Sequence, residues 1–80
     1  MTRISIKEYA KKHIKCNPDE NLKDVISRLK DAVERKNSGA TCSICGASIW
    51  AVGSAVGGFE GCFTCITGEH DDSEDYEVFL

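Results

Sequence analysis

The 80-residue sequence has no long apolar run and none of the short motifs that mark common enzyme classes. No stretch approaches the roughly 18 apolar residues that a membrane-spanning helix needs. Residues 1–15 are charged throughout and lack the apolar centre of a secretory signal peptide. No Ser-His-Asp set stands out, and neither a Gly-x4-Gly-Lys phosphate loop nor a His-Glu-x2-His motif is present. We therefore expect a cytoplasmic protein without enzymatic activity or membrane contact, in a compartment where thiols stay reduced.

Basic side chains are missing from the second half of the chain. All ten Lys and Arg lie at or before Lys36, and with the six acidic residues up to Asn37 that half has a formal charge of +4. From Ser38 onward there are seven acidic residues and no Lys or Arg, which gives −7. Either the two halves attract and pack on each other, or one of them meets an external partner.

Cysteine, by contrast, is abundant, and four of the five cysteines form two Cys-x2-Cys pairs. Cys42 and Cys45 make the first pair, and Cys62 and Cys65 make the second after sixteen intervening residues. This spacing is typical of a metal site with four thiolate ligands. Gly46, directly after the first pair, lets the backbone turn tightly so that both sulfurs can face one ion.

The two pairs resemble those of the zinc ribbon family, and the resemblance covers the chain from about residue 40 onward. It implies a structural Zn²⁺ and a role as an adaptor that contacts proteins or nucleic acids. Four thiolates close the tetrahedral shell and leave no position for a reactive water. Iron is the alternative metal, because tetrahedral sulfur sites also suit iron and the pairs are similar to those of rubredoxins, small iron electron carriers. The usual rubredoxin proline is absent from both pairs, and Ile66 replaces glycine after the second.

The first half predicts two helices. Ser5 and Glu8 fit a capping box, with Ile4 and Tyr9 as a hydrophobic staple, so a helix is expected over 6–15. Asn17 and Pro18 are expected to cap and begin a second helix. Its apolar face comprises Leu22, Val25, Ile26, Leu29, Ala32 and Val33. The pair should form an antiparallel hairpin that the second half covers.

The second half predicts strands and turns. Residues 48–52 read as one strand, the glycine-rich residues 53–61 as turns, and residues 76–80 as a final strand. The expected fold class is α+β, a single domain over 1–80. It consists of an N-terminal helical hairpin (1–38) followed by a small three-stranded antiparallel zinc ribbon (39–80) with an acidic C-terminal segment. A treble-clef arrangement would instead need a helix beginning at Cys62 to Cys65, and Gly68 with the acids after it argues against a long one.

Several other residues have both a functional and a structural interpretation. Cys16 and His13 form a His-x2-Cys pair, either part of a second site or a packed cysteine beside a packed histidine. His70 is a weak candidate for a further ligand. Candidate partner-binding residues are Trp50, Phe59, Phe63, Asp71, Asp72, Glu74 and Asp75, and candidate nucleic-acid contacts are Lys7, Lys11, Lys12 and Lys15.

The sequence leaves three alternatives for the function: binding a protein, binding a nucleic acid, or electron transfer through iron. The acidic second half favours a protein with a basic surface. The lysine stripe on the first helix could follow phosphates, but the acidic half would be repelled by DNA.

Overall fold

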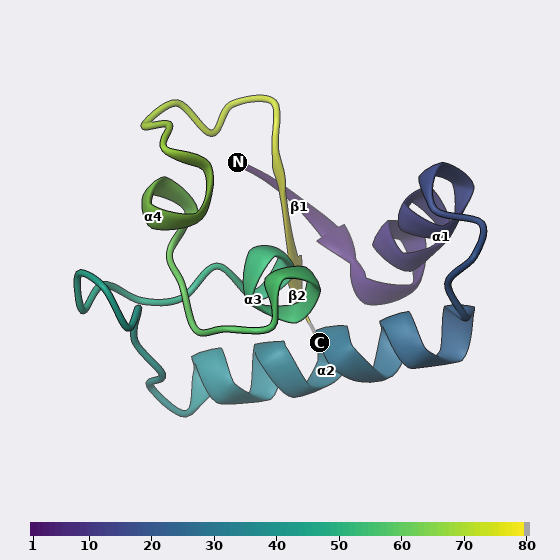
Figure 1. Ribbon diagram of the computed structural model, residues 1–80, viewed down its shortest axis with the longest axis horizontal. Coiled ribbons are helices and arrows are strands. Elements are labelled where there is room, and N and C mark those ends of the chain that lie inside the picture. Colours follow the sequence, from purple (N-terminus) through teal and green to yellow (C-terminus); the bar gives the residue numbers. More distant parts are fainter. Residues whose placement is uncertain (80) are drawn as a thin grey trace.

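The computed structural model describes residues 1–79, which form four helices and two short strands (Figure 1). In chain order the elements are β1 (Thr2–Ser5), α1 (Ile6–Cys16), α2 (Leu22–Asn37), α3 (Ala51–Gly57), α4 (Phe63–Thr67) and β2 (Tyr76–Phe79). The fold is a small α+β domain. Within these residues no helix combines the length and apolar character needed to cross a membrane.

The single sheet pairs the first strand with the last, in parallel. Thr2 lies opposite Tyr76, and Ile4 lies opposite Val78. Ile4 and Val78 are both buried and face the core. The prediction of a three-stranded antiparallel ribbon is therefore wrong. Between residues 1 and 79 the antiparallel pairing amounts to one isolated bridge, from Thr41 to Ser48.

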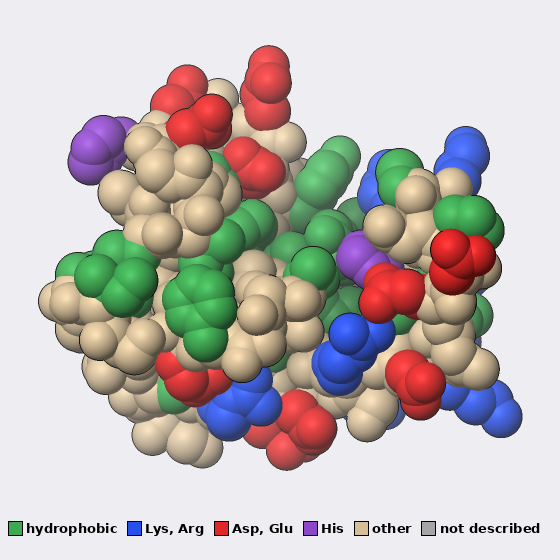
Figure 2. All heavy atoms as spheres, in the orientation of Figure 1, with side chains coloured by type: hydrophobic (Ala, Val, Ile, Leu, Met, Phe, Trp, Pro, Cys, Tyr) green, Lys and Arg blue, Asp and Glu red, His purple; other side chains and the backbone are tan. Residues whose placement is uncertain are grey.

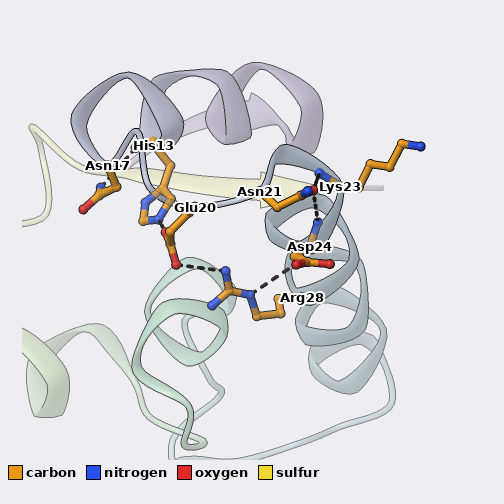
Figure 3. Close-up of polar contacts among 7 residues, drawn as sticks. All are labelled: His13, Asn17, Glu20, Asn21, Lys23, Asp24 and Arg28. Atoms are coloured by element: carbon orange, nitrogen blue, oxygen red, sulfur yellow. Dashed lines mark hydrogen bonds and ion pairs between the residues drawn. The ribbon is translucent and has the colours of Figure 1, made fainter.

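The first helix begins where the sequence predicts, and the second does not. The Ser5 hydroxyl accepts a hydrogen bond from the Glu8 amide, as expected of an N-cap. Ile4, however, belongs to β1. The α2 N-cap is Asn21, whose Oδ1 accepts from the amides of Lys23 and Asp24 at 2.8 and 3.4 Å (Figure 3). The expected start at Asn17 and Pro18 is wrong because Asn17 instead ends α1, where its amide binds the His13 and Ile14 carbonyls.

The two long helices pack on each other but do not form an antiparallel hairpin. In Figure 1, α2 runs along the long axis of the molecule, whereas α1 is foreshortened and steeply inclined to it. Buried residues from α2 are Val25, Leu29, Ala32 and Val33, at helical spacing on one face. They form the core together with Ile6, Ala10 and the residues of α3 and β2.

The expected strand over 48–52 does not form, and α3 replaces the end of that strand and the first part of the turns expected over 53–61, while residues 58–61 stay outside any helix or strand. Residues 51–55 of this helix are all buried, because it lies between α2 and the sheet (Figure 1). No side chain of its own caps α3. Instead the Glu77 carboxylate of β2 accepts hydrogen bonds from the Ala51 and Val52 amides at 2.9 and 3.3 Å, and from Lys36 Nζ at 2.7 Å. A carboxylate at this end also complements the helix dipole.

Candidate metal centre

Four cysteine sulfurs lie together at one end of the molecule. The Sγ atoms of Cys42, Cys45, Cys62 and Cys65 are all within 4.8 Å of one another, and those of Cys45 and Cys62 are 3.5 Å apart. Four thiolates at such separations can surround one ion tetrahedrally. The prediction that the two Cys-x2-Cys pairs converge is confirmed, and no other group of three or more His, Cys, Asp or Glu side chains in residues 1–79 is gathered as closely.

The first pair sits on a tight turn. The Gly46 amide donates to the Cys42 carbonyl at 2.9 Å, and the Cys42 amide donates to the Ala47 carbonyl at 2.6 Å. Gly46 has φ of 80°, a left-handed conformation that glycine adopts without a steric cost. Gly46 therefore forms the tight turn that the sequence predicts after the first cysteine pair.

The second pair sits at the beginning of a helix. Cys62 is the N-cap of α4, and its Sγ accepts from the Cys65 amide at 3.4 Å. The helix is only five residues long and ends at Gly68, which has φ of 79°. A treble-clef arrangement requires a helix at the second cysteine pair, and a short one is present there. The sequence instead favours a ribbon without this helix.

Residues 60 and 61 hold the two turns together. The Ser43 amide donates to the Glu60 carbonyl at 2.9 Å, which ties the first turn to the segment preceding Cys62. The Gly61 carbonyl accepts from the Trp50 amide at 2.8 Å and from the buried Ser54 hydroxyl at 3.2 Å. Position 61 has no room for a side chain, because a Cβ there would lie 2.8 Å from carbons of Phe59 and Ile66. The site is therefore anchored through α3 to the core.

The sulfurs differ in their proton affinity. Cys42 is buried, and backbone amides aimed at its sulfur, those of Cys45, Cys62 and Ile44, lower the pKa of this thiol to about 6. Hydrogen bonds with the neighbouring sulfurs of Cys62, Cys42 and Cys45 raise the pKa of Cys65 to about 12, because they stabilise its protonated thiol. A divalent cation stabilises all four thiolates and displaces the protons that remain on the thiols. The residues therefore fit a four-coordinate, closed metal site.

The predicted aromatic residues occupy different environments. Trp50 is partly buried against the core, donates from Nε1 to the Tyr76 carbonyl at 2.9 Å, and meets the Phe63 ring edge-on at 5.0 Å. Trp50 and Phe63 thus join the metal centre to the sheet. Phe59 is 43% exposed, and Ile44 of the first turn is exposed as well.

The His-x2-Cys pair does not form a second site. His13 Nε2 binds the carboxylate of Glu20, whose other oxygen accepts from Arg28 at 3.0 Å (Figure 3). The hydrogen bonds from Arg28 and then His13 lower the pKa of Glu20. Cys16 is an exposed free thiol at the end of α1. His70 lies in the loop after α4 and is not among the clustered ligands.

The charged candidates come from different elements of the fold. Acidic side chains gather over the loop between α4 and β2 (Figure 2), which contains Asp71, Asp72, Glu74 and Asp75. Asp72 is paired with the N-terminal amine at 3.1 Å. The lysines Lys7, Lys11, Lys12 and Lys15 are exposed on α1, and Lys12 Nζ lies 5.6 Å from the centre of the Tyr76 ring.

Supporting residues of the centre were missed by sequence reasoning. Ser54 and Glu77 fix α3, and hence the segment before Cys62, through bonds across 7 and 25 or more residues. No local pattern marks these roles. Comparisons with family models, curated proteins and solved structures returned no match. The geometry of the cysteines alone therefore defines a candidate four-cysteine metal-binding site.

Proposed function

We propose that this protein is a zinc-stabilised interaction module. The observation that carries the proposal is the convergence of four cysteine sulfurs from two separate turns. Zinc is the metal of first choice for a closed shell of four thiolates, and its binding energy adds to the folding energy of a small domain. The role is structural because the four sulfurs leave no ligand position for a substrate. A reducing compartment such as the cytoplasm is part of this proposal.

The metal is tested by purifying the protein without added metal and recording its metal content and absorbance. One zinc per chain, no visible colour, and loss of folded signal on chelation support the proposal. A red protein with iron that bleaches on reduction contradicts it and makes electron transfer the leading function. Cys16→Ser is the matched control, because this exposed thiol lies outside the cluster and its loss should leave the stoichiometry unchanged.

The interaction partner in this proposal is a protein with a basic surface. The support is the acidic loop before β2, in which Asp71 and Glu74 are exposed and Asp72 and Asp75 are half-buried. Among the ion pairs of residues 1–79, only Asp72 of these four is paired, with the N-terminal amine. A lysine-rich peptide serves as the probe in calorimetry at two salt concentrations. Binding should weaken as salt rises, because exposed charges are screened.

The residue test uses two quadruple variants of equal charge change. Neutralising Asp71, Asp72, Glu74 and Asp75 should abolish binding of the basic peptide. Neutralising four acids of the helical half, Asp19, Asp24, Asp31 and Glu34, should preserve it. If both variants lose the same amount of peptide affinity, the binding depends only on the net charge of the protein, and a defined acidic surface is contradicted.

The lysine stripe of α1 supports nucleic acid as the second candidate partner. Lys7, Lys11 and Lys15 are exposed and free of ion pairs within residues 1–79. A gel shift that survives replacing all three with glutamate would eliminate this candidate, since phosphate contacts require the positive charges.

A further inference from the structure

Residues from the start of α1, the middle of α2 and the end of β2 line an apolar groove. Its lining residues are Ile6, Lys7, Ile26, Lys30 and Phe79, and its volume is about 320 Å³. Ile6 is buried and Ile26 is half-buried, so they form the floor. Phe79 is 39% exposed and forms a wall. The groove is separate from the cysteine site and from the acidic loop, because it shares no residue with either.

The rim of the groove is positively charged from two elements. Lys7 comes from α1 and Lys30 from α2. The Arg3 guanidinium of β1, which lies 4.8 Å from the centre of the Phe79 ring, belongs to a neighbouring groove that shares Phe79. Within residues 1–79 neither rim lysine has an ion-pair partner. By contrast, Lys36, farther along α2, is paired with Glu77. The groove therefore combines an apolar floor with positive charge that no carboxylate of residues 1–79 pairs.

We propose that this groove binds an acidic segment of a partner protein that inserts one apolar anchor side chain. The floor removes the anchor from water, and the rim lysines pair with carboxylates on either side of it. Apolar anchors in a pocket provide the affinity of such contacts, and complementary charge provides rate and specificity. The volume is at the low end for a ligand pocket, which suits one or two side chains.

Two other occupants fit the groove less well. A nucleic-acid backbone would satisfy the lysines but leave the isoleucine floor without an apolar partner. A second copy of this chain would have to offer its acidic loop, and the residues from Glu69 to Asp75 include no apolar side chain to serve as the anchor. This inference goes beyond the proposed function, since it assigns the module a second face of opposite charge.

The probe is the blocked peptide acetyl-Glu-Glu-Phe-Leu-Glu-Glu-amide, titrated into the full-length, metal-loaded, ¹⁵N-labelled protein. The amide resonances of Ile6, Lys7, Ile26, Lys30 and Phe79 should shift together as peptide is added. A peptide with serine in place of Phe and Leu has the same charge but no anchor. It should bind about tenfold more weakly or worse, because the apolar contact supplies the affinity.

Two charge-reversal variants of equal net charge locate the site. Lys7→Glu with Lys30→Glu should weaken binding of the Phe-Leu peptide by about tenfold or more, because both rim charges become repulsive. Lys12→Glu with Lys15→Glu should change the affinity less than about threefold, as expected for residues outside the contact. All four positions are exposed, and the amide spectrum verifies that each variant stays folded.

Three results would overturn the proposal: equal binding of the serine peptide, equal losses in both lysine variants, or shifts centred on other residues. Preferential binding of a single-stranded oligonucleotide at the groove, or a concentration-dependent dimer that shifts the same amides, would assign it to another occupant. Neutralising the acidic loop should leave peptide binding intact, so failure here is distinguishable from failure of the basic-partner proposal.

Discussion

Replacing Glu77 with alanine tests how strongly the last strand holds α3. The carboxylate is largely buried and accepts hydrogen bonds from the Ala51 and Val52 amides and from Lys36 Nζ. The variant leaves two helix N-terminal amides and one ammonium without their acceptor. Because α3 has no cap of its own, no nearby side chain replaces the lost one.

The expected cost follows from these contacts. Loss of an N-cap typically costs about 0.5–2 kcal/mol. A hydrogen bond to a charged group contributes about 1.5–3 kcal/mol, and here the Lys36 side chain is 32% exposed, so the lower end applies. We expect Glu77→Ala to lower the free energy of unfolding by about 2–3.5 kcal/mol, a large share of the roughly 5–15 kcal/mol of a small domain.

Urea unfolding of the metal-loaded protein, followed by far-ultraviolet circular dichroism, measures this loss. Glu77→Gln keeps one acceptor oxygen for α3 but loses the charge, so it should cost about half as much as alanine. Glu74→Ala removes an exposed acid three residues away and should change the free energy of unfolding by less than about 0.5 kcal/mol. A Glu77→Ala change as small as that of the control, or a glutamine variant no better than alanine, would refute this reasoning.

Three further predictions concern the metal site and its support. Gly53→Ala should destabilise the protein by about 1–3 kcal/mol, because a Cβ there would lie 2.6 Å from Ile66 Cδ1 and closer still to the Trp50 ring. Gly57→Ala, where the nearest atom is at 3.4 Å, is the matched control and should be neutral or stabilising by up to about 1 kcal/mol in thermal melts. Chelation should abolish the near-ultraviolet signal of Trp50, and a retained signal would show that the site does not depend on metal. Cys45→Ser should lower metal affinity in a competition titration with a chromogenic chelator, and unchanged affinity would remove this sulfur from the ligand set.

The cysteine site was predictable because its signal is local. Each pair spans four residues, and Gly46 marks the turn of the first one. The Ser5 cap was predictable for the same reason, since its partner Glu8 is three residues away. The α2 start was mispredicted because Asn17 and Asn21 both resemble caps, and the end of α1 uses the first of them.

The rest of the fold depends on contacts that no local pattern records. Glycines at 53 and 57 disfavour a helix by intrinsic propensity, yet α3 forms because its small residues let it pack against α2 and because Glu77 caps it. The alternation around Val78 correctly indicated a strand. Its parallel partner, β1, is more than 70 residues away, and the pattern of Ile4 also fitted a helix staple.

The pairing of β1 with β2 has a consequence for when this protein can fold. Ile4 and Glu77 are among the residues that complete the core and the α3 cap, and they stand near opposite ends of the described chain. During synthesis α1 and α2 can form early, but β1 has no partner until residues 76–79 have been made. Contacts that close so long a loop form late and slowly. Ile4 of β1 therefore stays unpaired until β2 has been made, and the cysteine pairs, whose separation is short, can bind metal before the sheet exists.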